Sequence, residues 1–278
     1  MRLFFLFNLL NILSMIVEMN LIYNYHTHTK RCGHALGEDE DYVKAAIKVG
    51  IKELGFSDHI PFKGVVQRGV RMDYEQLDEY ISSINKLKEK YKDQIKIFLG
   101  FEAEYYHEVD DYYLDLLKRV DYLICGQHFS YNKKENVYVG FKHDNPDVAE
   151  SYTTRVVEAI KSGLFKYIAH PDIILRSYTL RDDFIEEQMR KICKAAEEYQ
   201  VPLEINLEGM RKKVMIGDPF GDNYYPYPYF WNIAKDYNIE VIIGADVHDP
   251  NHLYETYDRF AREIVEKYHL KLINHIDI

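Results

Sequence analysis

The sequence predicts an α/β protein folded as a closed or nearly closed (β/α) barrel, with a doubly wound open sheet as the alternative. Seven short apolar runs, rich in β-branched and aromatic residues, alternate along the chain with amphipathic stretches of helical spacing. No linker, repeat or low-complexity segment interrupts this alternation. Because sequential units of this kind build a parallel sheet covered by helices, all seven are assigned to one domain.

The predicted strands are the apolar runs at residues 21–25, 53–57, 95–101, 121–126, 166–169, 202–205 and 240–245. The predicted helices are 39–49, 74–91, 110–119, 146–161, 182–199, 229–237 and 253–268. In the second helix the apolar positions recur at helical spacing, as at Leu77, Ile81 and Ile84. Two long loops, 59–73 and 205–228, follow the second and sixth strands, and long loops at the ends of barrel strands usually carry function.

Composition limits the classes of function. The chain has 278 residues, 47% of them hydrophobic, which is enough for one substantial core. Its formal net charge of -10 gives no general attraction to nucleic acid or anionic membranes, so we expect neither nucleic acid binding nor stable membrane association. The three cysteines, Cys32, Cys125 and Cys193, form no paired motif, which predicts no disulfides and a cytoplasmic location.

The first 20 residues are treated separately from the domain at 21–278. They are apolar, with no acidic residue before Glu18, but they lack a small-residue cleavage site and are short for a membrane span. We interpret residues 1–20 as an N-terminal extension that arises from a mis-assigned start. A signal or anchor and a docked extra helix are the alternatives.

Histidines are concentrated at the ends of the predicted strands. Seven of the 12 lie at a strand end or in the loop just beyond it: His26, His28, His34, His59, His128, His170 and His248. In a parallel barrel all these ends open on one face, where catalytic groups gather. The other five, among them His252 and His275, are interpreted as solvated.

Two carboxylates join this set, Glu102 at the end of the third strand and Asp246 just before His248. In an extended strand, residues two apart point to the same side, so His26 and His28 can bind one ion, as can Asp246 and His248. Neutral imidazole and carboxylate ligands suit Zn, Mn or Fe. Nine ligands are too many for one ion, so the sequence predicts two or three divalent metal ions.

Four neighbouring side chains have two interpretations each. Asp58 would fix the tautomer of an imidazole, or it would cap a strand end. Glu204 would orient a metal ligand, or it would form an ion pair at the barrel mouth. Cys32 and Cys125 lie near the predicted ligands, and we interpret them as small packing residues rather than as ligands.

The motifs that carry these residues are HTH (26–28), CGH (32–34), SDH (57–59), GFEAE (100–104), GQH (126–128), AHPD (169–172) and GADVH (244–248). From Tyr25 to Pro250 the chain resembles the PHP (polymerase and histidinol phosphatase) superfamily. Its segments RMD (71–73), EIN (204–206) and GMRKK (209–213) resemble those of monofunctional histidinol-phosphatases. The resemblance implies a distorted seven-stranded TIM-like (β/α) barrel with a metal site at the C-terminal ends of the strands.

The resemblance also implies how the ligands divide among three ions. One ion would take His26, His28, Glu102 and Asp246, a second would share Glu102 with His128 and His170, and a third would take His34, His59 and His248. The chain departs from the pattern after EIN, where LEG stands in place of a small hydroxyl residue before the glycine. That departure bears on substrate contacts rather than on the metals.

The implied activity is hydrolysis of L-histidinol phosphate to L-histidinol and phosphate in histidine biosynthesis. We expect a hydroxide that bridges two ions, held by Glu102, His128, His170 and Asp246, to attack phosphorus. Three arginines in segments that follow strands, Arg71, Arg176 and Arg211, would grip the phosphate, since guanidinium matches phosphate geometry. The alternative interpretation is that each of the three is an ordinary surface arginine.

Two other functions stay open at this point. The first is a related phosphoesterase acting on another small phosphomonoester or on a nucleotide. The second is a non-catalytic metal-binding module, which predicts missing ligands and an attached polymerase domain. The C-terminal segment 268–278 would either pack across the barrel or serve a homo-oligomer contact.

Overall fold

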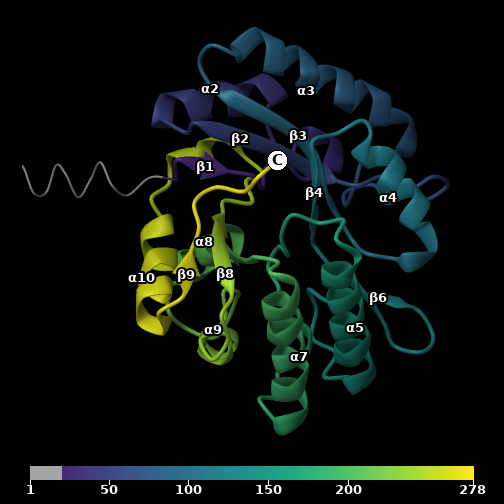
Figure 1. Cartoon of the computed structure of the whole chain (residues 1–278), viewed down its shortest axis with the longest axis vertical. Helices are drawn as coiled ribbons and strands as arrows, with labels where there is room; N and C mark the ends of the chain where they lie inside the picture. Colours follow the sequence, from purple (N-terminus) through teal and green to yellow (C-terminus); the bar gives the residue numbers. More distant parts are fainter. Residues whose placement is uncertain (1–20) are drawn as a thin grey trace, which may run out of the picture.

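The computed structural model describes residues 21–278, so the predicted extension at 1–20 lies outside the described residues. A curled parallel sheet forms the centre of the protein (Figure 1). Its two ladders have the orders β1-β2-β3-β4 and β7-β8-β9. The strands are β1 (Tyr23–Asn24), β2 (Glu53–His59), β3 (Lys96–Ala103), β4 (Tyr122–Cys125), β7 (Leu203–Asn206), β8 (Glu240–Gly244) and β9 (Lys271–Leu272), and β5 (Phe129–Tyr131) and β6 (Asn136–Tyr138) form a separate antiparallel hairpin.

Isolated parallel bridges connect the two ladders. Ile168 bridges Cys125 of β4 and Leu203 of β7, and Thr27 bridges Val247 on the other side. Six of the seven predicted runs form strands, but the fifth, 166–169, forms only these single bridges. The chain turns at His170, where φ is 32°, so the extended backbone ends before a ladder develops. A curled parallel α/β sheet is therefore confirmed, and a count of seven strands is not.

Helices cover the outer face of this sheet, with α2 and α3 lying over β1 to β3 and α5 beside α7 (Figure 1). Their bounds are α2 (Asp39–Val49), α3 (Leu77–Tyr91), α4 (Asp110–Leu117), α5 (Pro146–Ser162), α6 (Ile174–Ser177), α7 (Asp183–Tyr199), α8 (Leu207–Met215), α9 (Pro228–Ala234) and α10 (Asp258–Tyr268). The prediction of a loop over 205–228 was wrong for its first part, because α8 lies there. The Asn206 side chain accepts a hydrogen bond from the Glu208 backbone N–H and so starts that helix. No helix among residues 21–278 is long and apolar enough to cross a bilayer.

Successive side chains of a strand point to opposite faces of the sheet, so the two faces contact two separate apolar regions. In β3, Leu99 and Phe101 belong to the core between sheet and helices, whereas Phe98 belongs to a second cluster inside the curled sheet. Tyr122, Tyr167 and other inward side chains fill the same interior. Glu102 has the inward parity of Phe98, four residues further along β3. The inner face thus changes from aromatic at its start to ionisable at its C-terminal end.

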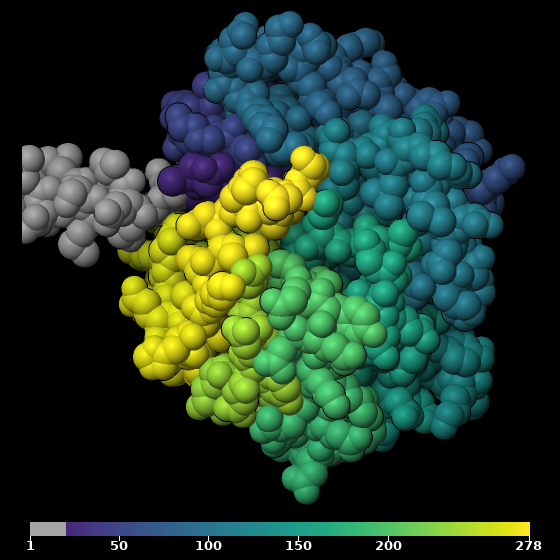
Figure 2. Space-filling view, viewed as in Figure 1, coloured from purple at the N-terminus to yellow at the C-terminus, as the bar shows by residue number. Residues whose placement is uncertain are grey.

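The C-terminal segment closes the aromatic end of this interior. It runs diagonally over the face seen in Figure 2, in yellow, after β9 has paired with β8. Ile276 is 6% exposed and packs within the inner cluster. His275 is exposed, as interpreted from the sequence, and its Nδ1 lies 3.1 Å from both Tyr25 Oη and Glu53 Oε2. Packing across the barrel, one of the two predictions for this segment, is confirmed.

We predict that Ile276→Ala lowers the free energy of unfolding by about 2 kcal/mol or more, since it removes a buried side chain and leaves a cavity at the end of the inner cluster. Urea unfolding followed by circular dichroism measures the change. Leu180→Ala is the matched control, because Leu180 is 50% exposed and should change stability by less than about 0.5 kcal/mol. Equal unfolding midpoints for both variants would contradict the packing described.

Candidate metal centre

The nine predicted ligands converge at the C-terminal ends of the parallel strands. His26 and His28 follow β1, His59 ends β2 and Glu102 lies near the end of β3. The parallel register of β2 and β3 sets His59 directly beside Glu102. The remaining five follow η1 (Lys30–Cys32), β4, the 166–169 segment and β8: His34, His128, His170, Asp246 and His248. Segments far apart in sequence therefore present these side chains at one edge of the sheet.

Glu102 lies at the middle of the group and is 1% exposed. Its Oε1 is 2.8 Å from His170 Nε2 and 3.5 Å from His128 Nε2. Its Oε2 is 3.1 Å from His59 Nδ1, and it also lies 3.4 Å from His28 Nε2 and 3.5 Å from His26 Nε2. One buried carboxylate is thus shared by five imidazoles.

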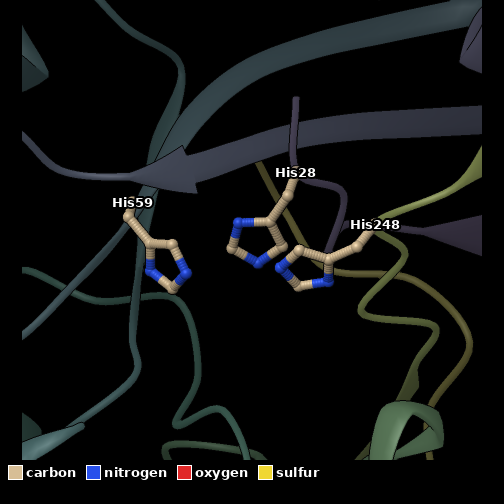
Figure 3. A group of neighbouring side chains, drawn as sticks. All are labelled: His28, His59 and His248. Carbon is tan, nitrogen blue, oxygen red and sulfur yellow. The ribbon is translucent and has the colours of Figure 1, made fainter. Parts of the chain in front are cut away.

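Asp246 supplies the second carboxylate. Its Oδ1 lies 3.2 Å from His28 Nε2 and 3.5 Å from both His26 Nε2 and His248 Nδ1. Figure 3 shows His28 between His59 and His248. The ring centroid of His28 lies 4.3 Å from that of His59 and 4.0 Å from that of His248. Every predicted ligand belongs to at least one group of three whose ligand atoms lie within 4.8 Å of one another: His28, His59 and His248; Cys32, His34 and His248; His26, His170 and Asp246; His26, His28 and Glu102; and His59, Glu102 and His128.

Ligand atoms in these groups lack hydrogen-bond partners among the described residues. They include His26 Nε2, both ring nitrogens of His28, Glu102 Oε2, Asp246 Oδ1 and His248 Nε2. Buried polar atoms are nearly always paired, and a carboxylate facing imidazole lone pairs gains little without a cation between them. Imidazole nitrogen and carboxylate oxygen are ligands that Zn, Mn and Fe accept, so the residues present fit divalent metal ions.

The electrostatics favour positive charge at this edge. Burial raises the pKa of Glu102, but His128, His26 and His59 outweigh it and hold that pKa well below its usual range. Burial lowers the pKa of His28, yet Asp246 and Asp58 raise it to about 9. By contrast, burial and the neighbouring His28 lower the pKa of His59 to about 4. The two carboxylates stay ionised, and some of the imidazoles stay neutral and able to act as ligands.

Local backbone geometry is unusual at two of the predicted ligands. His170 and Asp246 have φ values of 32° and 45°, a region that non-glycine residues rarely adopt. A Cβ at Gly126 would lie 1.8 Å from Glu102 Oε1, so only glycine leaves room for the carboxylate there. Strain of this kind persists where the surrounding structure holds it, typically at functional sites.

Two carboxylates predicted to support the ligands are present beside them. Glu204 Oε1 lies 2.7 Å from His26 Nδ1, the contact that an orienting role requires. Asn206, which sequence reasoning missed, donates to Glu204 Oε2 at 2.8 Å and to Asp246 Oδ2 at 2.9 Å. Asp58 instead accepts from the backbone N–H groups of Thr29 and His59, and its Oδ1 is 3.8 Å from His28 Nδ1.

Glu104 is a second residue that the sequence analysis missed. Its Oε1 lies 3.3 Å from His128 Nδ1, and both of its oxygens accept from the Arg71 guanidinium at 2.9 Å. Arg71 also donates to the Ile60 carbonyl at 2.8 Å and is 3% exposed. The Arg71 guanidinium therefore holds the carboxylate that orients His128. Phosphate binding by Arg71 stays a prediction. The only sequence signal for Glu104 was its place two residues after Glu102.

The other two arginines differ from each other. Arg211 is buried, pairs with Glu208 and Glu255, and donates to the Ala245 carbonyl at 2.7 Å. Arg176 has no ion pair among the described residues and lies over the Tyr224 ring at 5.1 Å. Substrate binding by either residue stays a prediction. Of the two, only Arg211 has carboxylate partners among the described residues.

A cavity of about 790 Å³ opens over these groups. Its floor includes His34, His59, Glu102, His128, His170, Asp246 and His248. Its walls include Tyr138, Phe141, Lys212, Tyr225 and His252. The volume suits a small molecule whose anionic end contacts the floor and whose remainder contacts aromatic walls.

The family model for the PHP domain matches residues 24–208. The chain belongs to the PHP domain family. The match covers the motifs from His26 to Glu204, whereas Asp246 and His248 lie beyond it. The family predicted from the motifs of this PHP domain is therefore confirmed.

Curated relatives of this PHP domain include histidinol-phosphatases. A probable histidinol-phosphatase of Deinococcus radiodurans is 29% identical over 247 residues, which cover 87% of this chain and 90% of the relative. The histidinol-phosphatase of Bacillus subtilis is 24% identical over 266 residues, covering 84% of this chain and 96% of the relative. The likeness thus extends through nearly the whole length of both relatives.

A solved structure has the same fold. The histidinol phosphate phosphatase of Lactococcus lactis, complexed with Zn, L-histidinol and phosphate, matches with a TM-score of 0.69 at 18% identity. It covers 92% of this chain and 98% of its own. A putative histidinol phosphatase of Listeria monocytogenes matches with a TM-score of 0.70 at 19% identity, over 85% of this chain and 99% of its own. Both likenesses concern the fold.

We predict that Glu104→Gln lowers the affinity for divalent metal about 10- to 100-fold, because the amide orients His128 Nδ1 less firmly than the carboxylate does. Competition with a chromophoric chelator measures this affinity. Glu108→Gln is the matched control, since Glu108 is exposed on the same stretch of chain. Equal affinities in Glu104→Gln and the control would rule out an orienting role for Glu104.

Proposed function

We propose that this protein is a metal-dependent phosphomonoesterase that hydrolyses L-histidinol phosphate to L-histidinol and phosphate. The observation that carries the proposal is the pair of buried carboxylates, Glu102 and Asp246, set among seven imidazoles beneath a cavity of small-molecule size. Phosphate esters are anions, and this chain has a net charge of -10. A cluster of divalent cations at the cavity floor resolves that conflict.

The substrate assignment rests on the relatives. The D. radiodurans and B. subtilis proteins carry the name histidinol-phosphatase and align along almost their whole length. The L. lactis structure of the same fold holds L-histidinol and phosphate together with Zn. Because the motifs of the candidate site match the family, we assign the same reaction and its place in histidine biosynthesis to this chain.

The nine side chains at the strand ends are proposed to hold two or three ions of Zn, Mn or Fe. Glu102 contacts five imidazoles, so it is suited to lie between two ions, as the family division implies. His26 is the best oriented ligand, because Glu204 accepts its Nδ1–H and leaves Nε2 free to face both carboxylates. When bound, divalent ions neutralise phosphoryl oxygens and lower the pKa of water.

Protein groups around the cations complete the site. Asn206 fixes Asp246 by donating to Oδ2, which leaves Oδ1 toward His28. Arg211 holds the backbone at Ala245 and so fixes the approach to Asp246. Arg176 is the proposed cation for the phosphate outside the floor of the cavity, since its guanidinium has no carboxylate partner among residues 21–278. Tyr138 and Phe141 add aromatic walls to the cavity above these groups.

The wider setting is proposed from the same observations. The parallel segments, including the one at Ile168, would act as one seven-segment barrel, and residues 21–278 as one domain. Its three cysteines are buried and unpaired, which fits a reducing, cytoplasmic setting. We propose a small-molecule partner rather than nucleic acid, because the cavity is compact and the charge is negative.

Phosphate release from L-histidinol phosphate by the full chain tests this function. p-Nitrophenyl phosphate and a short single-stranded DNA serve as comparison substrates, each with chelator and with Mn or Zn restored. We expect chelator-sensitive turnover with a strong preference for histidinol phosphate. Preferred turnover of another ester would keep the metal site and reject the substrate. No hydrolysis by metal-loaded protein would reject the enzyme.

We predict that Glu102→Gln reduces kcat/KM for histidinol phosphate by more than about 100-fold, a larger loss than removal of a supporting residue brings, because it removes the charge shared by five imidazoles. Metal content measured by plasma emission spectrometry should fall in the same variant. Glu135→Gln, an exposed substitution on the β5–β6 turn, is the control. Wild-type turnover by Glu102→Gln would contradict the proposed site.

A further inference from the structure

We propose that Tyr225 contacts the substrate by donating a phenolic hydrogen bond to a phosphate-ester oxygen, and that Lys213 and Asp172 are positioning residues that hold Tyr225 over the metal centre. The proposal rests on the phosphatase activity proposed above and adds a contact on the protein side of the cavity. It concerns the segment that follows α8.

Tyr225 forms part of the cavity wall next to the predicted metal ligands. Its ring centroid lies 5.7 Å from that of His170, and the residue is 5% exposed. The cavity lining includes Tyr225, His170 and Asp246 together. The Tyr225 hydroxyl has no hydrogen-bond partner within residues 21–278, whereas other buried tyrosines, such as Tyr122 and Tyr152, donate to backbone carbonyls. A donor beside the cavity floor is therefore available to a ligand.

Two side chains, one from α8 and one from the segment after His170, bind the backbone next to Tyr225. On α8, Lys213 Nζ donates to the Pro226 carbonyl at 2.6 Å. Beside the predicted ligand His170, Asp172 Oδ2 accepts from the Tyr227 backbone N–H at 2.5 Å. A Cβ at Gly209 would lie 2.0 Å from the Tyr225 carbonyl oxygen, so α8 packs directly against this residue. These three contacts fix the chain at the Tyr225 carbonyl and at the two residues that follow it.

The cost of burying these groups indicates that the contacts are specific. Lys213 is 0% exposed, and a buried ammonium loses hydration that one carbonyl only partly replaces. Burial lowers the pKa of Lys213 to about 8. A methionine of similar length would fill the same space without that penalty. The buried ammonium of Lys213 therefore serves the position of the 225–227 segment rather than packing alone.

A phenol at this place suits a phosphate ester. A tyrosine phenol is protonated at neutral pH. A protonated phenol is a hydrogen-bond donor, and phosphoryl oxygens are strong acceptors. A hydrogen bond to a charged group typically changes affinity about 10- to 100-fold. The contact orients the ester and transfers no proton.

The test compares Tyr225→Phe, Lys213→Met and the double variant in the full chain loaded with metal. We measure kcat/KM for histidinol phosphate, the affinity for inorganic phosphate by calorimetry, and the metal content. Tyr199→Phe is the matched control, because Tyr199 is 44% exposed on α7. We expect Tyr225→Phe to weaken phosphate binding about 10- to 100-fold with unchanged metal content. Lys213→Met should weaken binding too, but should add nothing in the Tyr225→Phe background.

Full phosphate affinity in Tyr225→Phe would overturn the substrate contact, and additive losses in the double variant would overturn the positioning role of Lys213. If Lys213→Met does not fold, Tyr225→Phe alone decides the contact. The binding arm separates this proposal from the function proposed above. If the wild-type protein does not hydrolyse histidinol phosphate, weaker phosphate binding by Tyr225→Phe still supports the contact, and equal binding still overturns it.

Discussion

The buried carboxylate of Glu102 is the constraint on which the rest of the site depends. Its two oxygens lie 2.8 to 3.5 Å from five imidazoles, and the side chain is 1% exposed. An ionised carboxylate in such a place is costly unless cations compensate it. The parallel strands bring the imidazoles to it, Gly126 leaves space for it, and the register of β2 and β3 sets His59 beside it. The fold thus serves to collect ligands around one charge.

Supporting contacts extend from this charge in separate directions. Arg71 holds Glu104, which holds His128, while Asn206 holds both Glu204 and Asp246. At the opposite end of the strands, aromatic side chains and the C-terminal segment close the interior. Rigid packing at one end and a polar network at the other explain how strained residues such as His170 and Asp246 are kept in place.

Much of the site could be predicted from sequence because strand-end position is a local signal. Six of the seven apolar runs form strands, and the structure brings the nine proposed ligands together. The 166–169 run looked like a strand, yet it forms single bridges, since the turn at His170 depends on tertiary contacts. Glu104 was missed because its partners Arg71 and His128 are distant in sequence, and Asn206 because its bond to Asp246 spans 40 residues. The pairing of Arg71 with Glu104 and of Arg211 with Glu255 has no spacing signal for the same reason.

Anomalous X-ray scattering from crystals of the metal-loaded protein, recorded at the Zn and Mn edges, would locate the ions at the strand ends. We expect two or three anomalous peaks within coordination distance of the nine strand-end ligands, with Glu102 next to two of them. Peaks confined to surface histidines, or no peak near Glu102 in protein saturated with metal, would contradict it.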